Sequence, residues 1–315
     1  MYLHAIVGRL TIFTAGLALL ASCSSGEGNS SDNNSDSGKE TRAYETEKGE
    51  VTIPSDPETI VTDYYAGELL SVGADVSGTG PDAFSNPFLK EQLSGAEDVG
   101  APLNPEEVLE LDPDLIVVMY DENYEQLSEI APTVYIPYNP DTNVQETLDT
   151  FGELTNNQTE AENFKETIET TASEAKERIE GTIDEGDTFG IYELTNNDEL
   201  YVFGANGGRG GQAIYNALDL SPPEKIQEEV MGGNAQEISM EVLKDYSADH
   251  MFMTTYDPES TGESKEKIQE SDVWANLDAV QNDQFYFLDF DTYYPYDPIS
   301  VNEQIDLIAD KLSEQ

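Results

Sequence analysis

Short apolar runs and helical spacing alternate along the chain, beginning near Val51. The segment Glu58–Thr62 (ETIVT) is apolar and β-branched, as expected for a short buried strand. The following YYAGELLSVGA places apolar residues three and four positions apart, which predicts a helix that ends at Gly73. A strand followed directly by a helix is the repeating unit of α/β folds.

Two later stretches repeat one design. PEEVLELDPDLIVVMY has Glu106, then Asp114 eight residues further on, then an apolar run. SMEVLKDYSADHMFMTTY has Glu241, then Asp249 eight residues further on, then another apolar run. Each predicts a short helix, a turn and a strand buried in a parallel sheet. One such unit in each half predicts two similarly built α/β lobes.

The longest helical pattern lies between these units, at residues 157–182. Apolar residues recur there at three- and four-residue steps: Ala161, Phe164, Ile168, Ala172, Ala175 and Ile179. Thr159 and Glu162 have the spacing of a capping box, and Gly181 follows as a stop. We therefore expect a single helix of roughly 30 Å to join an N-terminal lobe (49–156) to a C-terminal lobe (183–315), with a ligand cleft to one side.

The N-terminal end predicts export and lipidation. Arg9 precedes an apolar segment, Leu10–Leu20, that is too short for a comfortable membrane span. The sequence Leu-Ala-Ser-Cys that ends at Cys23 resembles the lipobox of bacterial lipoproteins, so residues 1–23 are expected to be a signal peptide with Cys23 carrying the lipid. The alternative is an ordinary cleaved signal with an incidental cysteine. Residues 24–48 are polar and predict a flexible tether.

The charge balance limits the partners. The chain has 65 acidic and 14 basic residues, a formal net charge of −51. A nucleic acid would be repelled by this field. The acids are spread along the chain, which fits both a protein of a saline or alkaline exterior and an ordinary acidic secreted protein, and the sequence leaves both open.

Arg209 lies among glycines in LYVFGANGGRGGQAIYNAL. The stretch lacks the lysine and hydroxyl residue of a P-loop and has no clean G-x-G-x-x-G, so a phosphate cradle is disfavoured. The glycines instead indicate a tight turn and close approach of a ligand. Arg209 either forms a salt bridge to one of the many acids or contacts a ligand. Propensity favours the salt bridge, whereas we expect the glycines to leave the guanidinium few packing neighbours and an open approach. The family resemblance given below adds the weight that makes us favour ligand contact.

No catalytic or metal-binding set can be assembled from the sequence. His250 is the single histidine outside the signal-like segment and sits in an apolar run, which predicts a core position. A zinc or manganese site would need several His or Cys donors. No Ser/His/Asp or Cys/His set for nucleophilic catalysis can be assembled from one buried-looking histidine and one cysteine that is expected to carry a lipid. Paired carboxylates of a glycosidase are abundant, but nothing selects a pair. We expect no enzyme and no protein-bound metal or cofactor.

Several motifs together resemble a known class. The lipobox, the polar tether, DPDLIV, the long helix and VWANLDAVQNDQFYFLD (Val273–Asp289) resemble the helical-backbone class of ABC-transporter substrate-binding proteins, which serve iron–siderophore, haem and cobalamin importers. Within it, the GRGG segment and DTYYPYDP (Asp291–Pro298) look most like ferric hydroxamate-binding lipoproteins of Gram-positive bacteria. The segments DYYAGELLSVGA and NPFLKEQL (Asn86–Leu93) also resemble this group of lipoproteins.

The resemblance implies two Rossmann-like lobes joined by one helix, with the ligand in the cleft and little hinge motion. It also implies that Arg209 bonds the hydroxamate oxygens that coordinate iron, and that Tyr201, Tyr293 and Tyr294 are cleft aromatics. The family usually has a tryptophan two residues before this arginine, whereas this chain has Gly207. A stacking wall would then be missing beside Arg209.

Other aromatic residues are candidates from their positions alone. Tyr296 shares a Pro-interrupted loop with Tyr293 and Tyr294, where core packing is poor. Others follow the ends of expected strands, where α/β proteins bind ligands: Tyr64, Tyr65, Phe84, Tyr120 and Tyr138. For each of these, a half-buried core position is the alternative.

Charge favours one ligand class. A ferric tris-catecholate carries about three negative charges and would need several nearby cations in a low-dielectric cleft. The sequence offers Arg209 and Lys90 among many acids. A neutral or cationic ferric hydroxamate fits better, and it would arrive with its iron already chelated.

The expected partners are a ferric siderophore and an ABC permease dimer with its cytoplasmic ATPase. By the resemblance, Glu106 and Glu241 dock into arginine pockets of the permease, one from each lobe; their alternative role is that of solvated acids at helix starts. The protein is expected to be a monomer on the outer face of the cell membrane. A haem or cobalamin receptor, an extracellular hydrolase and a structural envelope lipoprotein are the alternatives.

Overall fold

The structure is a computed structural model that describes residues 40–314. The signal-like segment, Cys23 and most of the polar tether lie outside the described residues. Across the described part of the chain, no helix combines the length and the apolar character that a membrane crossing requires.

The folded part begins with a β-hairpin of β1 (Thr41–Thr46) and β2 (Gly49–Pro54), which pair antiparallel. The expectation of a tether up to residue 48 is therefore wrong for residues 41–48. Tyr44 and Val51 pack against the main hydrophobic core, and the Arg42 guanidinium donates to the main-chain oxygen of Leu154 at 2.9 Å. These contacts stabilise a segment that looks too polar to fold by itself.

The N-terminal lobe is built on a five-stranded parallel sheet in the order β5-β4-β3-β6-β7. Its strands are β3 (Ile60–Thr62), β4 (Val76–Thr79), β5 (Glu97–Asp98), β6 (Leu115–Val118) and β7 (Thr133–Tyr135). Its helices are α1 (Ala66–Ser71), α2 (Pro81–Ser85), α3 (Pro105–Glu110), α4 (Tyr124–Ser128) and α5 (Val144–Thr155).

The C-terminal lobe repeats the strand order as β10-β9-β8-β11-β12. Strands β8, β11 and β12 pair in parallel, and β9 runs antiparallel to both of its neighbours, β8 and β10. Its strands are β8 (Phe189–Thr195), β9 (Leu200–Phe203), β10 (Ala235–Ile238), β11 (His250–Tyr256) and β12 (Phe285–Leu288). Its helical segments are the π-helix η1 (Gln212–Ala217), α7 (Glu224–Glu229), the 3₁₀ helix η2 (Met240–Tyr246), α8 (Glu263–Gln269), α9 (Asp272–Ala275), α10 (Asp278–Gln281), α11 (Phe290–Tyr293) and α12 (Pro298–Ser313). The fold is thus the expected α/β class with two lobes.

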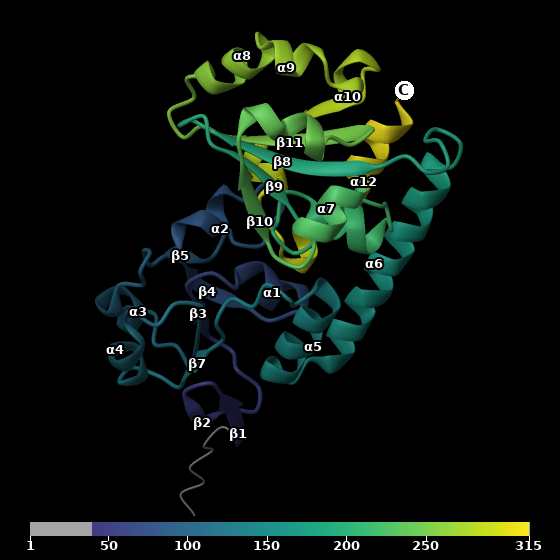
Figure 1. The fold of residues 1–315 in the computed structure, drawn as a ribbon. Helices are drawn as coiled ribbons and strands as arrows, with labels where there is room; N and C mark the ends of the chain where they lie inside the picture. The colour runs from purple at the N-terminus through teal and green to yellow at the C-terminus, as the bar shows by residue number, and fades with distance from the viewer. Residues whose placement is uncertain (1–39, 315) are drawn as a thin grey trace, which may run out of the picture. The chain divides into compact units, whose positions relative to one another are not determined.

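One long helix, α6 (Gln158–Ile179), connects the lobes and runs from α5 towards the sheet of the C-terminal lobe (Figure 1). Five of its six apolar positions are buried, and Phe164 is half-buried. The capping box expected at Thr159 is wrong, because the helix begins earlier, after Asn157. A capping box is instead present at the start of α5, where Asn143 and Glu146 bond each other's main-chain N–H groups.

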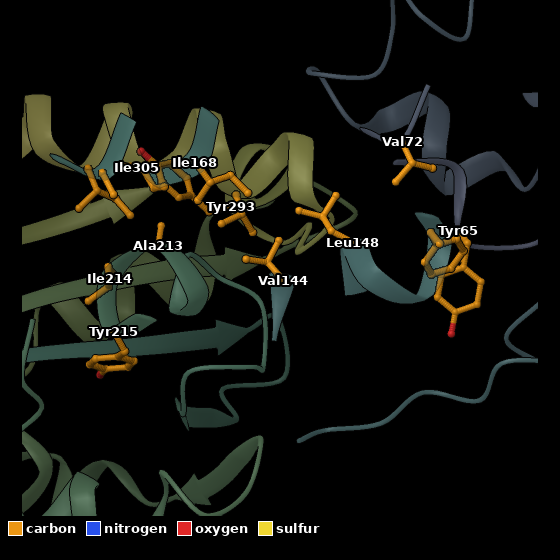
Figure 2. Packing of buried hydrophobic residues seen from close by; sticks show 14 of the residues in the cluster. Tyr65, Val72, Val144, Leu148, Ile168, Ala213, Ile214, Tyr215, Tyr293 and Ile305 are labelled. Atoms are coloured by element: carbon orange, nitrogen blue, oxygen red, sulfur yellow. The ribbon is translucent and has the colours of Figure 1, made fainter. Parts of the chain in front are cut away.

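A single hydrophobic cluster extends through both lobes. Figure 2 shows Tyr65 and Val72 of the N-terminal lobe, Leu148 of α5 and Ile168 of α6 with residues of the C-terminal lobe such as Ile214. All belong to one buried cluster, to which α12 also contributes. Shared burial of this kind restricts movement of one lobe against the other, because opening them would expose apolar surface to water.

The two repeated units place their aspartates alike. The Asp114 carboxylate accepts from the main-chain N–H groups of Glu58 and Thr59, ahead of β3. The Asp249 carboxylate accepts from the N–H and hydroxyl of Thr188, ahead of β8, at 2.8 and 2.7 Å. In each lobe the aspartate that precedes one parallel strand therefore ties down the start of its neighbour.

Replacing Asp249 with alanine is expected to lower the free energy of unfolding by about 1–3 kcal/mol, because two donors of Thr188 lose their acceptor. Urea denaturation measures the change. Asp245→Ala, on the exposed face of η2, is the control and should stay within about 0.5 kcal/mol of the parent. Equal stability of both variants would show that Asp249 does not anchor β8.

Candidate ligand-binding pocket

A pocket of about 1000 Å³ lies between the two lobes. The N-terminal lobe contributes the segment after β3, part of α1 and α2, and the C-terminal lobe contributes the ends of β8, β11 and β12, the glycine-rich loop and α11. The carboxyl ends of parallel strands are the usual ligand side of α/β sheets, because the connecting loops gather there.

The glycine-rich loop holds Arg209 in a left-handed turn. Gly208, Arg209 and Gly210 have φ angles of 73°, 56° and 84°. Glycine adopts this conformation without steric cost, whereas arginine does not. The glycines on either side thus form the tight turn that the sequence indicated, and the contacts of Arg209 must hold its own strained backbone in place.

The Arg209 side chain is packed and paired. Its Nε donates to Glu193 Oε2 at 2.8 Å and its Nη2 donates to Glu193 Oε1 at 3.1 Å. Its guanidinium carbon lies 4.4 Å from the ring centre of Phe203 and 4.6 Å from that of Tyr294. The expectation of few packing neighbours is wrong, because the loop folds this side chain between two aromatic rings.

Arg209 nevertheless lines the pocket. A guanidinium has five N–H donors. Two bond Glu193, and Nη1 uses one on the main-chain oxygen of Gly207 at 3.1 Å. Two N–H donors therefore remain for a ligand oxygen. The salt bridge and ligand contact, which the sequence offers as alternatives, are compatible in this geometry.

Gly207 is closely surrounded. A Cβ atom added there would lie 2.6 Å from the main-chain oxygen of Asn234 and 2.7 Å from Cδ1 of Phe203. A side chain at this position would collide with the backbone before β10. The aromatic wall beside Arg209 is present all the same, and Phe203 and Tyr294 supply it.

Aromatic side chains gather on the pocket wall. Tyr294 and Tyr296, both expected from the sequence, line it. Tyr64 lines it as well, with its ring centre 5.9 Å from that of Tyr296. Burial raises the pKa of the Tyr64 and Tyr296 hydroxyls, which therefore stay protonated at neutral pH and can donate hydrogen bonds.

Two expected aromatic residues belong to the core instead. Tyr293 is buried in the main cluster, since α11 turns it away from Tyr294. Tyr65 is also buried there, and its hydroxyl donates to the main-chain oxygen of Ile136 at 2.6 Å. Tyr65 and Tyr64 are adjacent at the entry to α1, so they face different sides, and the pocket side is that of Tyr64.

The other candidates lie away from the pocket wall or near its edge. Tyr201 packs on Phe203 along β9, and Phe84 packs against a small cluster with Leu89. Tyr120 is 55% exposed. Tyr138 is 39% exposed, with its ring centre 6.0 Å from that of Tyr296.

Acids outnumber bases on the pocket wall. The acids are Asp63, Glu68, Asp82, Glu193, Asp257, Asp289, Asp291 and Asp297, and the bases are Arg209 and Lys265. Lys90 is exposed and is not part of the wall; Lys265 contributes the second cation, with its Nζ 4.2 Å from the ring centre of Phe287. The pocket thus has a surplus of negative charge.

Most of these acids are bound by neighbouring donors. Asp63, at the end of β3, accepts from the main-chain N–H groups of Met119 and Tyr120. Burial raises the pKa of Asp63 above its usual value, and the hydrogen bonds from Met119 and Tyr120 offset part of that rise. Asp289 accepts from the N–H and hydroxyl of Thr292 at the start of α11. These acids shape the loops at the strand ends.

His250 is a core residue, as the sequence predicts. It is fully buried, stacks on Phe189 with ring centres 4.8 Å apart, and has its Nε2 3.2 Å from Asp187 Oδ2. Between residues 40 and 314, no three His, Cys, Asp or Glu side chains are arranged to hold a metal ion.

Glu106 and Glu241 are exposed at matching places in the two lobes. Glu106 is in the first turn of α3, where its main-chain N–H donates to the Asn104 side chain at 3.0 Å. Glu241 is in the first turn of η2. Each is in the helical segment of a repeated unit.

Sequence reasoning did not select most of the wall residues of the pocket, among them Glu68, Glu193, Lys265, Phe290 and Asp297. One signal was available. Glu68 interrupts the apolar positions of the helix predicted for YYAGELLSVGA four residues after Tyr64, and helical spacing would put both on one side of that predicted helix.

Two α/β lobes with matching strand orders, joined by one long helix around an aromatic pocket, define a bilobal substrate-binding protein. Residues 60–292 match the family model described as "Periplasmic binding protein". The chain belongs to this family.

Relatives and solved structures agree with this. The chain is 48% identical over 310 residues to the iron(3+)-hydroxamate-binding protein YxeB of Bacillus subtilis, covering 98% of this chain and 95% of the relative. It is 33% identical to the iron(3+)-hydroxamate-binding protein FhuD of the same organism, covering 95% of each. A FhuD fold-family structure from B. subtilis, described as a periplasmic binding protein component of a Fep/Fec-like ferrichrome ABC transporter, superposes with a TM-score of 0.78 at 33% identity. The match covers 86% of this chain and all of that one.

Proposed function

We propose that this protein captures a ferric hydroxamate siderophore outside the cytoplasm and delivers it to an ABC importer. The observation that carries the proposal is the pocket between the lobes, whose wall combines Arg209, tyrosine hydroxyls and a surplus of carboxylates. A catecholate trianion would meet repulsion there, whereas a neutral or cationic hydroxamate complex would not. The names of the two B. subtilis relatives support the same ligand class.

The pocket side chains suit an iron chelate. The two unused N–H donors of Arg209 would bond the hydroxamate oxygens around the iron, and the Glu193 pair would hold the guanidinium in position. Tyr64, Tyr294 and Tyr296 offer apolar faces and hydroxyl groups to the organic shell. The chelator supplies all iron ligands, so the protein performs no chemistry and holds no cofactor of its own.

Attachment and delivery complete the proposal. Lipid on Cys23 would anchor the chain to the outer face of the membrane, and the polar segment before the β1–β2 hairpin would act as its tether. As a monomer, the protein would dock on the permease through Glu106 and Glu241, one from each lobe, and the cytoplasmic ATPase would drive uptake.

A fluorescence titration with iron-loaded chelates tests the ligand class. Ferrioxamine- and ferrichrome-type complexes are expected to quench the tyrosines of the pocket and Trp274, which stacks on the wall residue Phe287 with ring centres 5.4 Å apart. We expect a Kd below about 1 µM, since a pocket of about 1000 Å³ is large enough to bury much of the ligand. Tight binding of a catecholate, haem or cobalamin without hydroxamate binding would contradict the proposal.

A further inference from the structure

Glu68 is a buried carboxylate that reaches the pocket. It lies on α1 between apolar residues and is 3% exposed, yet it forms part of the pocket wall. Within residues 40–314, the group that donates a hydrogen bond to its carboxylate is its own main-chain N–H. The nearby charge that acts on it is that of another acid, Asp297.

Asp297 comes from the opposite lobe, at the start of α12, and is 7% exposed. Its carboxylate already accepts from the N–H of Ser300 at 3.0 Å, the hydroxyl of Ser300 at 2.5 Å and the Asn86 amide at 3.1 Å. A Cβ atom at Gly67 would lie 2.3 Å from the Asp297 Cγ, so glycine permits this close approach to α1. Asp297 is therefore fixed beside Glu68, and its donors are not shared with Glu68.

A carboxylate in this position is costly. Burying a polar group without a hydrogen-bond partner costs roughly 2–7 kcal/mol, and an unpaired charge costs more. Burial, and then the charge of Asp297, raise the pKa of Glu68 well above its usual range. Two carboxyl groups at one pocket wall, one without a partner side chain, would be stabilised by a cation brought by the ligand.

The neighbouring wall fits an ammonium group. The Tyr64 and Tyr296 rings lie on the same wall, and the charge of Glu68 acts on both hydroxyls. Aromatic faces attract cations, and their hydroxyls can accept a hydrogen bond from an ammonium group. The Arg209 guanidinium is held by Glu193 and is not among the charges that act on Glu68.

We infer that Glu68, backed by Asp297, is a subsite for a protonated primary amine on the ligand. The pocket then prefers ferric hydroxamates that carry an ammonium group over those that do not. This inference rests on the proposed function, because it assigns one part of the chelate to one part of the pocket. The competing arrangement is a protonated Glu68 that donates a hydrogen bond to a carbonyl oxygen, which would not distinguish an amine from an amide.

A matched ligand pair tests the subsite. Ferrioxamine B is a linear trihydroxamate that ends in a primary amine, and its N-acetyl derivative has the same chain with the amine capped. Near neutral pH, the parent protein is expected to bind the amine form about tenfold more tightly, equivalent to about 1.4 kcal/mol. Glu68→Gln keeps the shape of the side chain and removes its charge, so it should weaken binding of the amine form and leave the acetylated form unchanged.

The pH dependence gives a second readout. An ammonium group needs an ionised Glu68, so binding the amine form releases a proton from a protonated Glu68. The titratable groups that face Glu68 are Tyr64 and Tyr65 from the segment just before α1, and Tyr296 and Asp297 from the opposite lobe. Affinity for the amine form should therefore rise as pH rises through the raised pKa of Glu68, and Glu68→Gln should abolish this rise. The acetylated form should show no such rise.

Asp291→Asn is the control for charge alone, because Asp291 is an exposed acid on the same pocket wall. It should keep the preference for the amine form. Equal affinity of the parent protein for both chelates, or loss of the preference in Asp291→Asn to the same extent as in Glu68→Gln, would overturn the subsite and leave the proposed function standing. Failure of both chelates to bind the parent protein would overturn the proposed function itself. Thermal unfolding of Glu68→Gln confirms that the variant is folded.

Discussion

Replacing Arg209 with alanine is expected to weaken binding of a ferric hydroxamate at least tenfold. It is also expected to lower the free energy of unfolding by about 3–5 kcal/mol, because Glu193 would remain buried without its partner. The Thr254 hydroxyl, 3.3 Å from Glu193 Oε2, is a weak replacement for a bidentate guanidinium. The variant also loses the contact of the guanidinium with Phe203 and Tyr294.

A double variant separates ligand contact from the salt bridge. Glu193→Gln removes the charge that Arg209→Ala leaves unpaired, so Arg209→Ala with Glu193→Gln should recover much of the lost stability. If Arg209 donates to the ligand, binding by the double variant stays at least tenfold weaker. Affinity restored to the parent level would show that Arg209 acts through the salt bridge alone. Urea denaturation and fluorescence titration provide the two measurements.

Arg209→Lys is the control for charge. Lysine keeps the positive charge but cannot form the two parallel hydrogen bonds to Glu193 or present the planar group to both rings. We expect intermediate affinity and intermediate stability. Binding by Arg209→Lys that equals the parent protein would show that the charge alone is sufficient.

The fold was predictable because its signals are local. The apolar runs of the buried strands and the three- and four-residue spacing of α6 are written in adjacent residues. The repeated Glu–Asp units showed the two lobes for the same reason. The β1–β2 hairpin was missed, since its polar sequence is stabilised by contacts with residues about a hundred positions away, such as that between Arg42 and Leu154.

The pocket was predictable only in part because its members meet through tertiary structure. Arg209 stood out by its glycine setting, but its partner Glu193 is one of 65 acidic residues and the sequence gives no reason to select it. Tyr64 and Tyr65 are adjacent in the bend and turn that lead into α1, and their side chains face different sides. Such a difference decides between pocket and core, and it depends on how α1 meets the sheet.

Gly207→Trp is expected to destabilise the protein and not to improve ligand binding. The resemblance places a tryptophan at this position, and on that ground alone the substitution would restore a wall beside Arg209. The space is already filled, because even a Cβ atom would lie 2.6 Å from the main-chain oxygen of Asn234. Overpacking of this kind costs typically 1–3 kcal/mol for a few added carbons and more for a large ring.

Gly207→Ala isolates the cost of the first carbon. We expect it to lower the free energy of unfolding by about 1–3 kcal/mol, and Gly207→Trp to lower it further and to weaken chelate binding by displacing Phe203 from Arg209. Gly232→Ala is the matched control, since a Cβ atom there meets nothing within 4 Å, and its stability should be within about 1 kcal/mol of the parent. A Gly207→Trp variant as stable as the parent and with tighter chelate binding would show that the loop can move aside, and that Phe203 and Tyr294 do not complete the wall.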